Sequence, residues 1–242
     1  MFNNGNCLNK KQILFLILNI SENRSSKKRM LYKITQYNPT TKILIWKITE
    51  SFDELFSQVI LKEKTLDRLQ SMKSEVHQRA FLSVRKLLQE SGHNDLQLHY
   101  DQFGKPHLEN ETHISITHSF DFSAIILSDE NVGIDIELRR EKIILIANKF
   151  VDNSEFGFLD KKKEEDYVSR LTVIWGVKEA IFKIRNEKGI SFKDHIFVAP
   201  FEMKDQKTKA LLTFGNLNIE FDICFEEIEN YTLVYAFQKG NR

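Results

Sequence analysis

The stretch "VIWGVKEAIFKIR" (residues 173–185) has the pattern of a helix with two distinct faces. One face carries aliphatic residues at helical spacing, which predicts a stripe packed on a core: Ile174, Val177, Ile181 and Ile184. Trp175, Glu179 and Lys183 follow one another at four-residue intervals and stack on another face. Packing explains the aliphatic stripe, but it does not explain a carboxylate and an ammonium one turn apart beside an indole.

The composition is that of an ordinary globular chain. Its 242 residues include 35 Lys and Arg, 34 Asp and Glu and 41% hydrophobic residues, enough for one large domain or two small ones. A net charge of +1 argues against a general binder of nucleic acid or membrane surfaces. Cys7 and Cys224 are too few for a disulfide framework or a cysteine metal site. They suit a reducing compartment, so we expect a cytoplasmic protein.

The N-terminal region superficially resembles an export signal. "ILFLILNI" (13–20) follows two lysines, but this apolar run is far shorter than the roughly 20 residues of a membrane span. The polar segment "SENRSSKKR" follows it, without a small-residue cleavage site. Because a strand-like pattern starts at Met30, we interpret 1–29 as a disordered extension or an upstream start. A weak export signal is the alternative.

The remaining chain alternates between strand-like and helical patterns. Helical periodicity covers 51–61, 64–91, 141–151 and 154–187. Period-two alternation covers 31–49, 96–100, 113–117, 123–128, 132–138 and four segments after 195. This repeated plan predicts an α+β protein with two similar lobes, 30–130 and 131–242, and a site between them.

Two acids lie just before the helical region, in "NVGIDIELRR" (131–140). In a strand Asp135 and Glu137 project from one face, while Ile134 and Ile136 turn to the core. Two carboxylates so close repel each other unless a cation lies between them. Carboxylate oxygens suit Mg²⁺ or Mn²⁺.

The late helix can complete such a site. Bringing Glu179 to this strand gives one metal ion three acids, and Lys183 would then meet an anionic group bound to the metal. The alternative is a solvated strand edge and a surface Glu–Lys pair contributing about 0.2–0.5 kcal/mol.

Residues suited to a phosphorylated ligand occur in three further segments. "ISITHSF" (114–120) ends a strand with Thr117, His118 and Ser119, and "FGKPHL" (103–108) holds Lys105 in a turn. The segment "VHQRAFLSVRKLL" (76–88) contributes two helical arginines, Arg79 and Arg85. Lys, Arg, His and Thr side chains are what a phosphate group requires.

"FGKP", "ISITHS", "GIDIE" and "WGVKEAIFK", in this order and spacing, resemble the 4′-phosphopantetheinyl transferases of the longer, surfactin-synthetase-activating type. The resemblance runs from about Met30 to the C-terminus. It implies a pseudo-dimeric α+β fold of two similar lobes, each an antiparallel sheet packed against a long helix, with the active site between them.

The resemblance also implies roles for particular residues. The magnesium ligands would be Asp135, Glu137 and Glu179. The ligands of coenzyme A would be Arg79 and His118 at the 3′-phosphate, Lys105 and Pro106 beside the adenosine, Lys183 at the pyrophosphate, and Thr117, which stands where the family usually has serine. Lys178 matches the lysine that precedes the glutamate. Further basic contacts could be Lys64 or Arg68. Ser115 and Gly176 depart from the usual Asn and Ser or Thr, which leaves fine positioning open.

The implied reaction is Mg²⁺-dependent transfer of the phosphopantetheine arm of coenzyme A to a serine of an apo acyl or peptidyl carrier protein, releasing 3′,5′-ADP. Glu179 would be the base that takes the serine proton, kept ionised by Lys183, which stabilises the phosphates. Trp175 would pack beneath the site. Lys161, Lys162 and Lys163 would either contact an acidic carrier or form a solvated helix start. A duplicated plan removes the need to dimerise, so we expect a monomer.

Two other classes fit the same residues. A metal-dependent phosphohydrolase or nuclease would use the three acids with an activated water. A degenerate relative would only bind coenzyme A or a carrier. The intact acidic trio and Lys183 argue against such decay.

Overall fold

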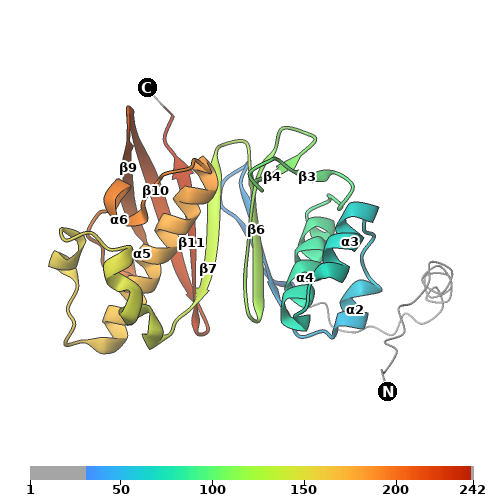
Figure 1. The fold of residues 1–242 in the computed structure, drawn as a ribbon, viewed down its shortest axis with the longest axis horizontal. Helices are drawn as coiled ribbons and strands as arrows, with labels where there is room; N and C mark the ends of the chain where they lie inside the picture. Colours follow the sequence, from blue (N-terminus) through green and yellow to red (C-terminus); the bar gives the residue numbers. More distant parts are fainter. Residues whose placement is uncertain (1–30, 241–242) are drawn as a thin grey trace, which may run out of the picture.

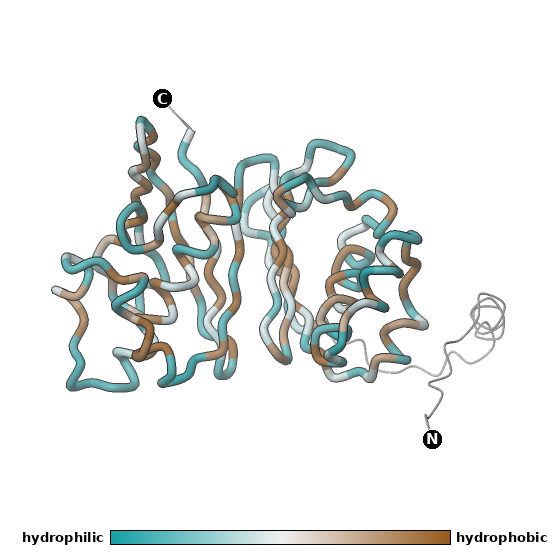
Figure 2. The backbone as a smooth tube through the Cα atoms, in the orientation of Figure 1, coloured by the Kyte–Doolittle hydropathy of each residue, from teal (hydrophilic) through white to brown (hydrophobic). Residues whose placement is uncertain are grey.

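The structure, a computed structural model, describes residues 31–240. The interpretation of residues 1–29 therefore lies outside the described part. Buried phenylalanines and aliphatic residues supply the core of two large antiparallel sheets. Helices α2, α3 and α4 gather on one side of the molecule and α5 on the other, with β6 and β7 between them (Figure 1). Brown, hydrophobic stretches follow the central strand β6 (Figure 2).

The first sheet has four strands in the order β1-β2-β6-β5. Their bounds are Leu31–Gln36, Lys42–Lys47, Phe122–Ser128 and His113–Ser119 for β1, β2, β6 and β5. Every neighbouring pair is antiparallel. One face of this sheet is covered by α4 (Glu75–Glu90), whose Leu87 and Leu88 are fully buried against Leu44 and Ile125.

The helices beside this sheet are shorter than the sequence pattern predicts. Helix α2 spans Phe52–Phe56 and begins at a capping box formed by Ser51 and Glu54. The single helix expected over 64–91 is wrong: α3 (Glu63–Ser71) and α4 are separated by three extended or irregular residues that start at Met72. Ser74 occupies the position before α4, where serine is favoured over the middle of a helix.

A small hairpin carries the "FGKP" turn. Strand β3 (Leu98–Tyr100) pairs with β4 (Pro106–Leu108), and Gly104 takes a left-handed conformation between them with φ of 85°. The side chain of Asp101 accepts hydrogen bonds from the amides of Phe103 and Lys105. This fixed turn holds Lys105 at the edge of a cavity that residues of α5 also line.

The second sheet has five strands in the order β7-β11-β10-β9-β8. Their bounds are Val132–Leu138, Tyr231–Gln238, Leu217–Ile228, Lys207–Phe214 and Ile196–Val198 for β7, β11, β10, β9 and β8. The 22-residue helix α5 (Glu164–Arg185) packs on one face of this sheet. The strands expected at 132–138 and after residue 195 are confirmed.

The segments around α5 differ from the long helices expected over 141–151 and 154–187. They are the 3₁₀ helices η1 (Glu141–Lys149) and η2 (Glu155–Phe158), and only residues from Glu164 onward form an α-helix. Short helical segments α6 (Phe192–His195) and η3 (Met203–Asp205) follow. Aliphatic periodicity in "EKIILIANK" does not distinguish a 3₁₀ from an α-helix, because both bury one side.

The two sheets meet through a shared apolar layer. Ile43 and Ile45 on the first sheet pack in one cluster with Ile134, Ile136 and other residues of the second. Strands β5 and β7 are also joined by side chains, since the hydroxyls of Ser115 and Thr117 accept hydrogen bonds from the amides of Ile134 and Ile136. Two amides on the outer edge of β7 are therefore satisfied by side chains rather than by a backbone partner.

Helix α5 lies unusually close to β7 because residue 133 is glycine. A Cβ atom built on Gly133 would lie 2.0 Å from the carbonyl oxygen of Ala180. Ala180 follows Glu179 directly, so this contact brings the polar face of α5 next to Asp135. The glycine of the "GID" motif therefore sets the distance between the strand that carries two acids and the helix that carries the third.

The mixed α+β class with antiparallel sheets is confirmed. The division into two similar lobes, 30–130 and 131–242, stays a prediction. Over residues 31–240, no helix is long and apolar enough to cross a membrane.

Candidate active site

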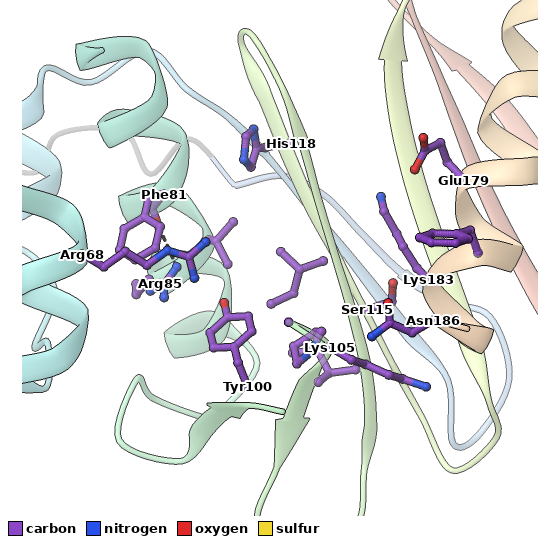
Figure 3. Close-up of a pocket in the computed structure, with 16 residues that line it drawn as sticks. Arg68, Phe81, Arg85, Tyr100, Lys105, Ser115, His118, Glu179, Lys183 and Asn186 are labelled. Carbon is purple, nitrogen blue, oxygen red and sulfur yellow. Dashed lines mark hydrogen bonds between the residues drawn. The ribbon is translucent and has the colours of Figure 1, made fainter. Parts of the chain in front are cut away.

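A cavity of about 370 Å³ lies between the helices of the first sheet and α5 (Figure 3). Arg68, Phe81, Arg85 and Tyr100 form one wall, from α3, α4 and β3. Glu179 and Lys183 form the opposite wall, from α5. His118 of β5 and Lys105 of the β3–β4 turn also line the cavity.

Asp135 sits behind this cavity, between β7 and α5. It is 4% exposed, and its Oδ1 accepts hydrogen bonds from Lys183 Nζ at 2.7 Å and from Thr117 Oγ1 at 3.2 Å. Lys183 Nζ also donates to the carbonyl of Ile134 at 2.9 Å. The other carboxylate oxygen, Oδ2, is buried and has no hydrogen-bond partner. A buried carboxylate oxygen in this state favours a cation.

The three acids influence one another electrostatically. The pKa of Glu137 is raised to about 7, first by burial and then by the neighbouring Asp135 and Glu179, against Trp175 and Lys183. Burial and Asp135 also raise the pKa of Glu179, although Lys183 opposes them. Lys183 therefore still favours the ionised form of Glu179, although its ammonium makes its ion pair with Asp135.

Asp135, Glu137 and Glu179 are the candidate ligands of a metal ion. Within residues 31–240, no group of three or more His, Cys, Asp or Glu side chains stands ready to hold a metal ion. Three carboxylates nevertheless lie in a region that is short of positive charge. The buried Asp135 Oδ2 has no hydrogen-bond partner, and the pKa values of Glu137 and Glu179 are raised. Oxygen donors of this kind fit Mg²⁺ better than a soft metal.

Thr117 supports the acids rather than the cavity. Its hydroxyl accepts from the amide of Ile136 and donates to Asp135, so it links β5 to β7 and fixes the aspartate rotamer. Ser115, one of the departures from the family pattern, bonds the amide of Ile134 and also lines the cavity. At the other departure, a Cβ atom on Gly176 would approach Val234 Cγ2 to 2.7 Å. The glycine thus accommodates valine on β11.

The structure places the nine predicted site residues in four positions. The cavity is lined by Lys105, Pro106, His118, Glu179 and Lys183. Thr117 and Asp135 lie behind it, and Glu137 borders a second cavity beside Trp175. Arg79 lies elsewhere, because its guanidinium donates to the carbonyls of Glu50 and Ile48. Its predicted contact with a phosphate stays a prediction that this arrangement does not favour.

The sequence pattern did not reveal how the wall opposite α5 is built, and it gave no sign of the aromatic Phe81 and Tyr100. Arg68, raised only as one of two possibilities, stacks its guanidinium over the rings of Phe81 and Tyr100, with centroid distances of 5.5 Å. Arg85 forms a buried ion pair with Asp95 at 3.1 Å. Arg68 of α3 lies at the same cavity wall as Arg85 of α4. Because the two helices are separate, the periodicity of one continuous helix does not indicate that these arginines share a wall.

The surroundings of the cavity also lower the pKa of its histidine and lysine. His118 is exposed on β5, but partial loss of hydration lowers its pKa, as do the nearby Lys183, His77 and Arg68, while Asp135 opposes them. Burial likewise lowers the pKa of Lys105, whose Nζ donates to the carbonyl of Ile184 at 2.7 Å. Both groups would gain from an anionic ligand.

Two predicted residues have neighbours that the pattern did not reveal. Trp175 packs between Phe150 and Phe192, and its Nε1 donates to Glu137 Oε1 at 3.4 Å. Lys178 is fully buried and pairs with Glu155. The lysine run Lys161–Lys163 is exposed just before α5, so both of its interpretations remain open.

Comparison with known proteins adds a direct match. Residues 131–236 match the family model described as the 4′-phosphopantetheinyl transferase superfamily. The chain is 34% identical over 83 residues to the 4′-phosphopantetheinyl transferase gsp of Aneurinibacillus migulanus, covering 34% of this chain and 35% of gsp. It is 29% identical over 103 residues to the 4′-phosphopantetheinyl transferase Sfp of Bacillus subtilis (strain 168), covering 40% and 44%. Less than half the length of either relative is matched. The resemblance drawn from the motifs is confirmed.

Proposed function

We propose that the chain transfers the phosphopantetheine arm of coenzyme A to a serine of an apo acyl or peptidyl carrier protein, because residues 131–236 match the family model of the 4′-phosphopantetheinyl transferase superfamily. The supporting observation is the cavity that has basic and aromatic side chains on one wall and Glu179 with Lys183 on the other. A nucleotide with several phosphates matches both walls.

The basic wall would bind the nucleotide end. Arg68 and Arg85 provide fixed guanidinium groups, and a purine can stack on Tyr100 or Phe81. His118 would take up a proton beside a phosphate. The guanidinium of Arg68 is exposed on α3, while Arg85 is held by Asp95. Arg68 is therefore the arginine better placed to contact a ligand.

The opposite wall would perform the chemistry. The Lys183 ammonium neutralises charge on the diphosphate as the bond between the β-phosphorus and the ADP oxygen breaks. The carrier serine oxygen forms the new bond to phosphorus, and its proton passes to a carboxylate oxygen of Glu179. The raised pKa of Glu179 makes it a stronger base than an exposed glutamate.

A divalent ion completes the proposal. Asp135, Glu137 and Glu179 would hold Mg²⁺, which supplies further neutralisation of the diphosphate when bound. Their oxygens have the hard-donor chemistry and the uncompensated charge that such an ion requires. We further propose a cytoplasmic monomer, in keeping with the free Cys224.

Intact-mass analysis of apo carrier proteins tests this function. Incubation with coenzyme A and Mg²⁺ should add one phosphopantetheine arm to the carrier and release 3′,5′-ADP. Asp135→Ala should abolish transfer while leaving the thermal transition in place, since Asp135 serves charge rather than packing. A variant that still modified the carrier at the wild-type rate would contradict the metal site. Release of 3′,5′-ADP without any carrier would instead indicate a hydrolase.

A further inference from the structure

Lys178 is a charged residue in a place where packing alone calls for an apolar one. Its side chain has no exposed surface, and that of its partner Glu155 is 2% exposed. Replacing a buried ion pair by apolar residues of similar size often leaves stability unchanged or improves it. Stability alone therefore does not explain why this buried ion pair is present.

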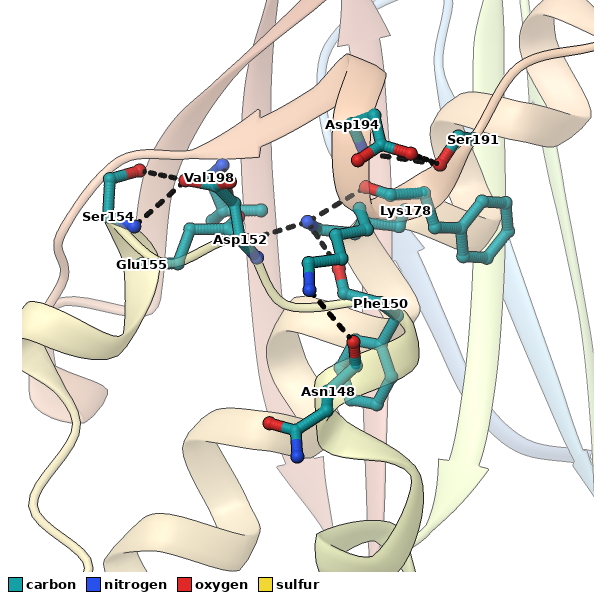
Figure 4. A network of polar contacts seen from close by, with 11 residues as sticks. Asn148, Phe150, Asp152, Ser154, Glu155, Lys178, Ser191, Asp194 and Val198 are labelled. Atoms are coloured by element: carbon teal, nitrogen blue, oxygen red, sulfur yellow. Dashed lines mark hydrogen bonds and ion pairs between the residues drawn. The ribbon is translucent and has the colours of Figure 1, made fainter.

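The ammonium of Lys178 donates hydrogen bonds to oxygens of three separate segments (Figure 4). Nζ donates to Glu155 Oε2 and to the carbonyl of Phe150, both at 2.7 Å, and to the carbonyl of Phe192 at 3.0 Å. Glu155 in turn accepts from the amides of Asp152 and Val198. One lysine of α5 thus fixes the segment before η2 and the start of α6 and, through Glu155, the end of β8.

The two residues whose carbonyls Lys178 holds also place their rings against one indole. The centroid of Trp175 lies 5.1 Å from that of Phe150 and 5.6 Å from that of Phe192. Trp175 Nε1 donates to Glu137 Oε1. A continuous path of contacts therefore runs from the Lys178 ammonium through two backbone carbonyls and their rings to the indole, and from there to a carboxylate.

We propose that Lys178 is a positioning residue for the Glu137 carboxylate, acting through the Phe150 and Phe192 rings that hold Trp175. The proposal rests on the proposed function, in which Glu137 is a metal ligand. A hydrogen-bond donor behind a ligating carboxylate fixes its orientation, and losing such a partner typically lowers metal affinity 10–100-fold. A lysine can do this where an apolar residue cannot, because it binds both carbonyls at one point.

The binding of Mn²⁺ to the full chain, followed by the electron paramagnetic resonance signal of the free ion, tests this without any turnover. Trp175→Phe keeps a ring between Phe150 and Phe192 but removes the donor. Lys178→Met is combined with Glu155→Gln, so that no unpaired charge is buried. The matched control is Trp46→Phe, which removes an indole bond to another glutamate, Trp46 Nε1 to Glu50 Oε2 at 3.3 Å, in the first sheet.

Both Trp175→Phe and the paired Lys178 and Glu155 variant should weaken Mn²⁺ binding roughly tenfold, and combining them should weaken it no further. Trp46→Phe should bind as the wild type does. In that background Trp175 is the remaining tryptophan of the chain. Its fluorescence anisotropy decay should show faster indole motion once Lys178 is replaced.

The outcomes separate the inference from the function it rests on. Wild-type Mn²⁺ affinity in Trp175→Phe, together with a large loss in Glu137→Ala, overturns the positioning role alone. Multiplying losses in the combined variant overturn the path through Trp175. A wild-type chain that binds no Mn²⁺ removes the metal site and the positioning role together, whereas carrier modification would still test transfer separately.

Discussion

Gly133→Ala should damage the active site without touching any residue that carries a charge. The added Cβ would lie 2.0 Å from the Ala180 carbonyl oxygen and 3.0 Å from Ile184 Cγ1. Because non-bonded carbon and oxygen atoms stay roughly 3 Å or more apart, α5 and β7 must separate by about 1 Å. The 2.7 Å contact between Lys183 and Asp135 crosses this same gap, so it would be lost.

Two magnitudes follow from that displacement. Overpacking of this kind costs about 1–3 kcal/mol, which in a chain of this size lowers the melting temperature by roughly 2–12 °C. A displacement of about 1 Å between catalytic groups can cost about 100-fold in rate, or roughly 2.7 kcal/mol of transition-state stabilisation. We therefore expect a loss of about 100-fold in rate in a chain that still folds, with only a moderately lower melting temperature.

The assays are thermal melting and initial rates of carrier modification at saturating coenzyme A. Gly157→Ala is the matched control, because a Cβ at Gly157 meets no atom within 4 Å. It should leave both measurements near wild type. If Gly133→Ala melted and reacted like Gly157→Ala, the close approach of α5 to β7 would not set the active-site geometry, and the reasoning would be refuted.

Further predictions concern the ligand walls and the exposed lysines. Arg68→Ala should raise the KM for coenzyme A about tenfold and leave the melting temperature unchanged. Arg79→Ala should mainly lower the melting temperature, because it removes hydrogen bonds to backbone carbonyls. The opposite pattern would support Arg79 as the phosphate ligand. The pKa of His118 is lower in the folded protein than in the unfolded chain. Just below pH 6.5 the unfolded chain therefore binds a proton that the folded protein does not bind. Without ligand, the contribution of His118 to stability falls as the pH drops through that range. A bound phosphate would favour the protonated form of His118. Calorimetry should therefore show that coenzyme A binds more tightly, with proton uptake, as the pH falls from about 8 to about 6, and His118→Gln should remove that pH dependence. Charge reversal at Lys161 and Lys162 should raise the KM for an acidic carrier without changing that for coenzyme A, and an unchanged carrier KM would exclude docking there.

Local patterns predicted the parts of this molecule that depend on neighbouring residues. Alternation in "GIDIE" placed Ile134 and Ile136 in the core and Asp135 on the other face, and the structure agrees. The helical stripe of α5 is buried as expected. Periods of two and 3.6 report such faces directly.

Tertiary partners were less accessible to sequence reasoning. Glu179 and Lys183 are one turn apart, yet the lysine pairs with Asp135 on a strand about 50 residues earlier. Arg79 has the spacing of a cavity residue but turns to the carbonyls that follow β2. Which partner a charged side chain finds depends on how sheet and helix pack, and no local period reports that.

The apolar layer between the two sheets has a further consequence for the covalent link that joins them. Residues 129–131 connect β6 to β7 at the surface, so cleavage there would remove no packing contact. Each separate fragment would then expose a broad apolar surface that includes residues such as Ile45 or Leu233. We expect each fragment to aggregate when it is produced alone. Produced together, the two pieces should reassemble as a non-covalent pair, and the intact backbone would then serve as a tether that keeps the local concentration of each half high.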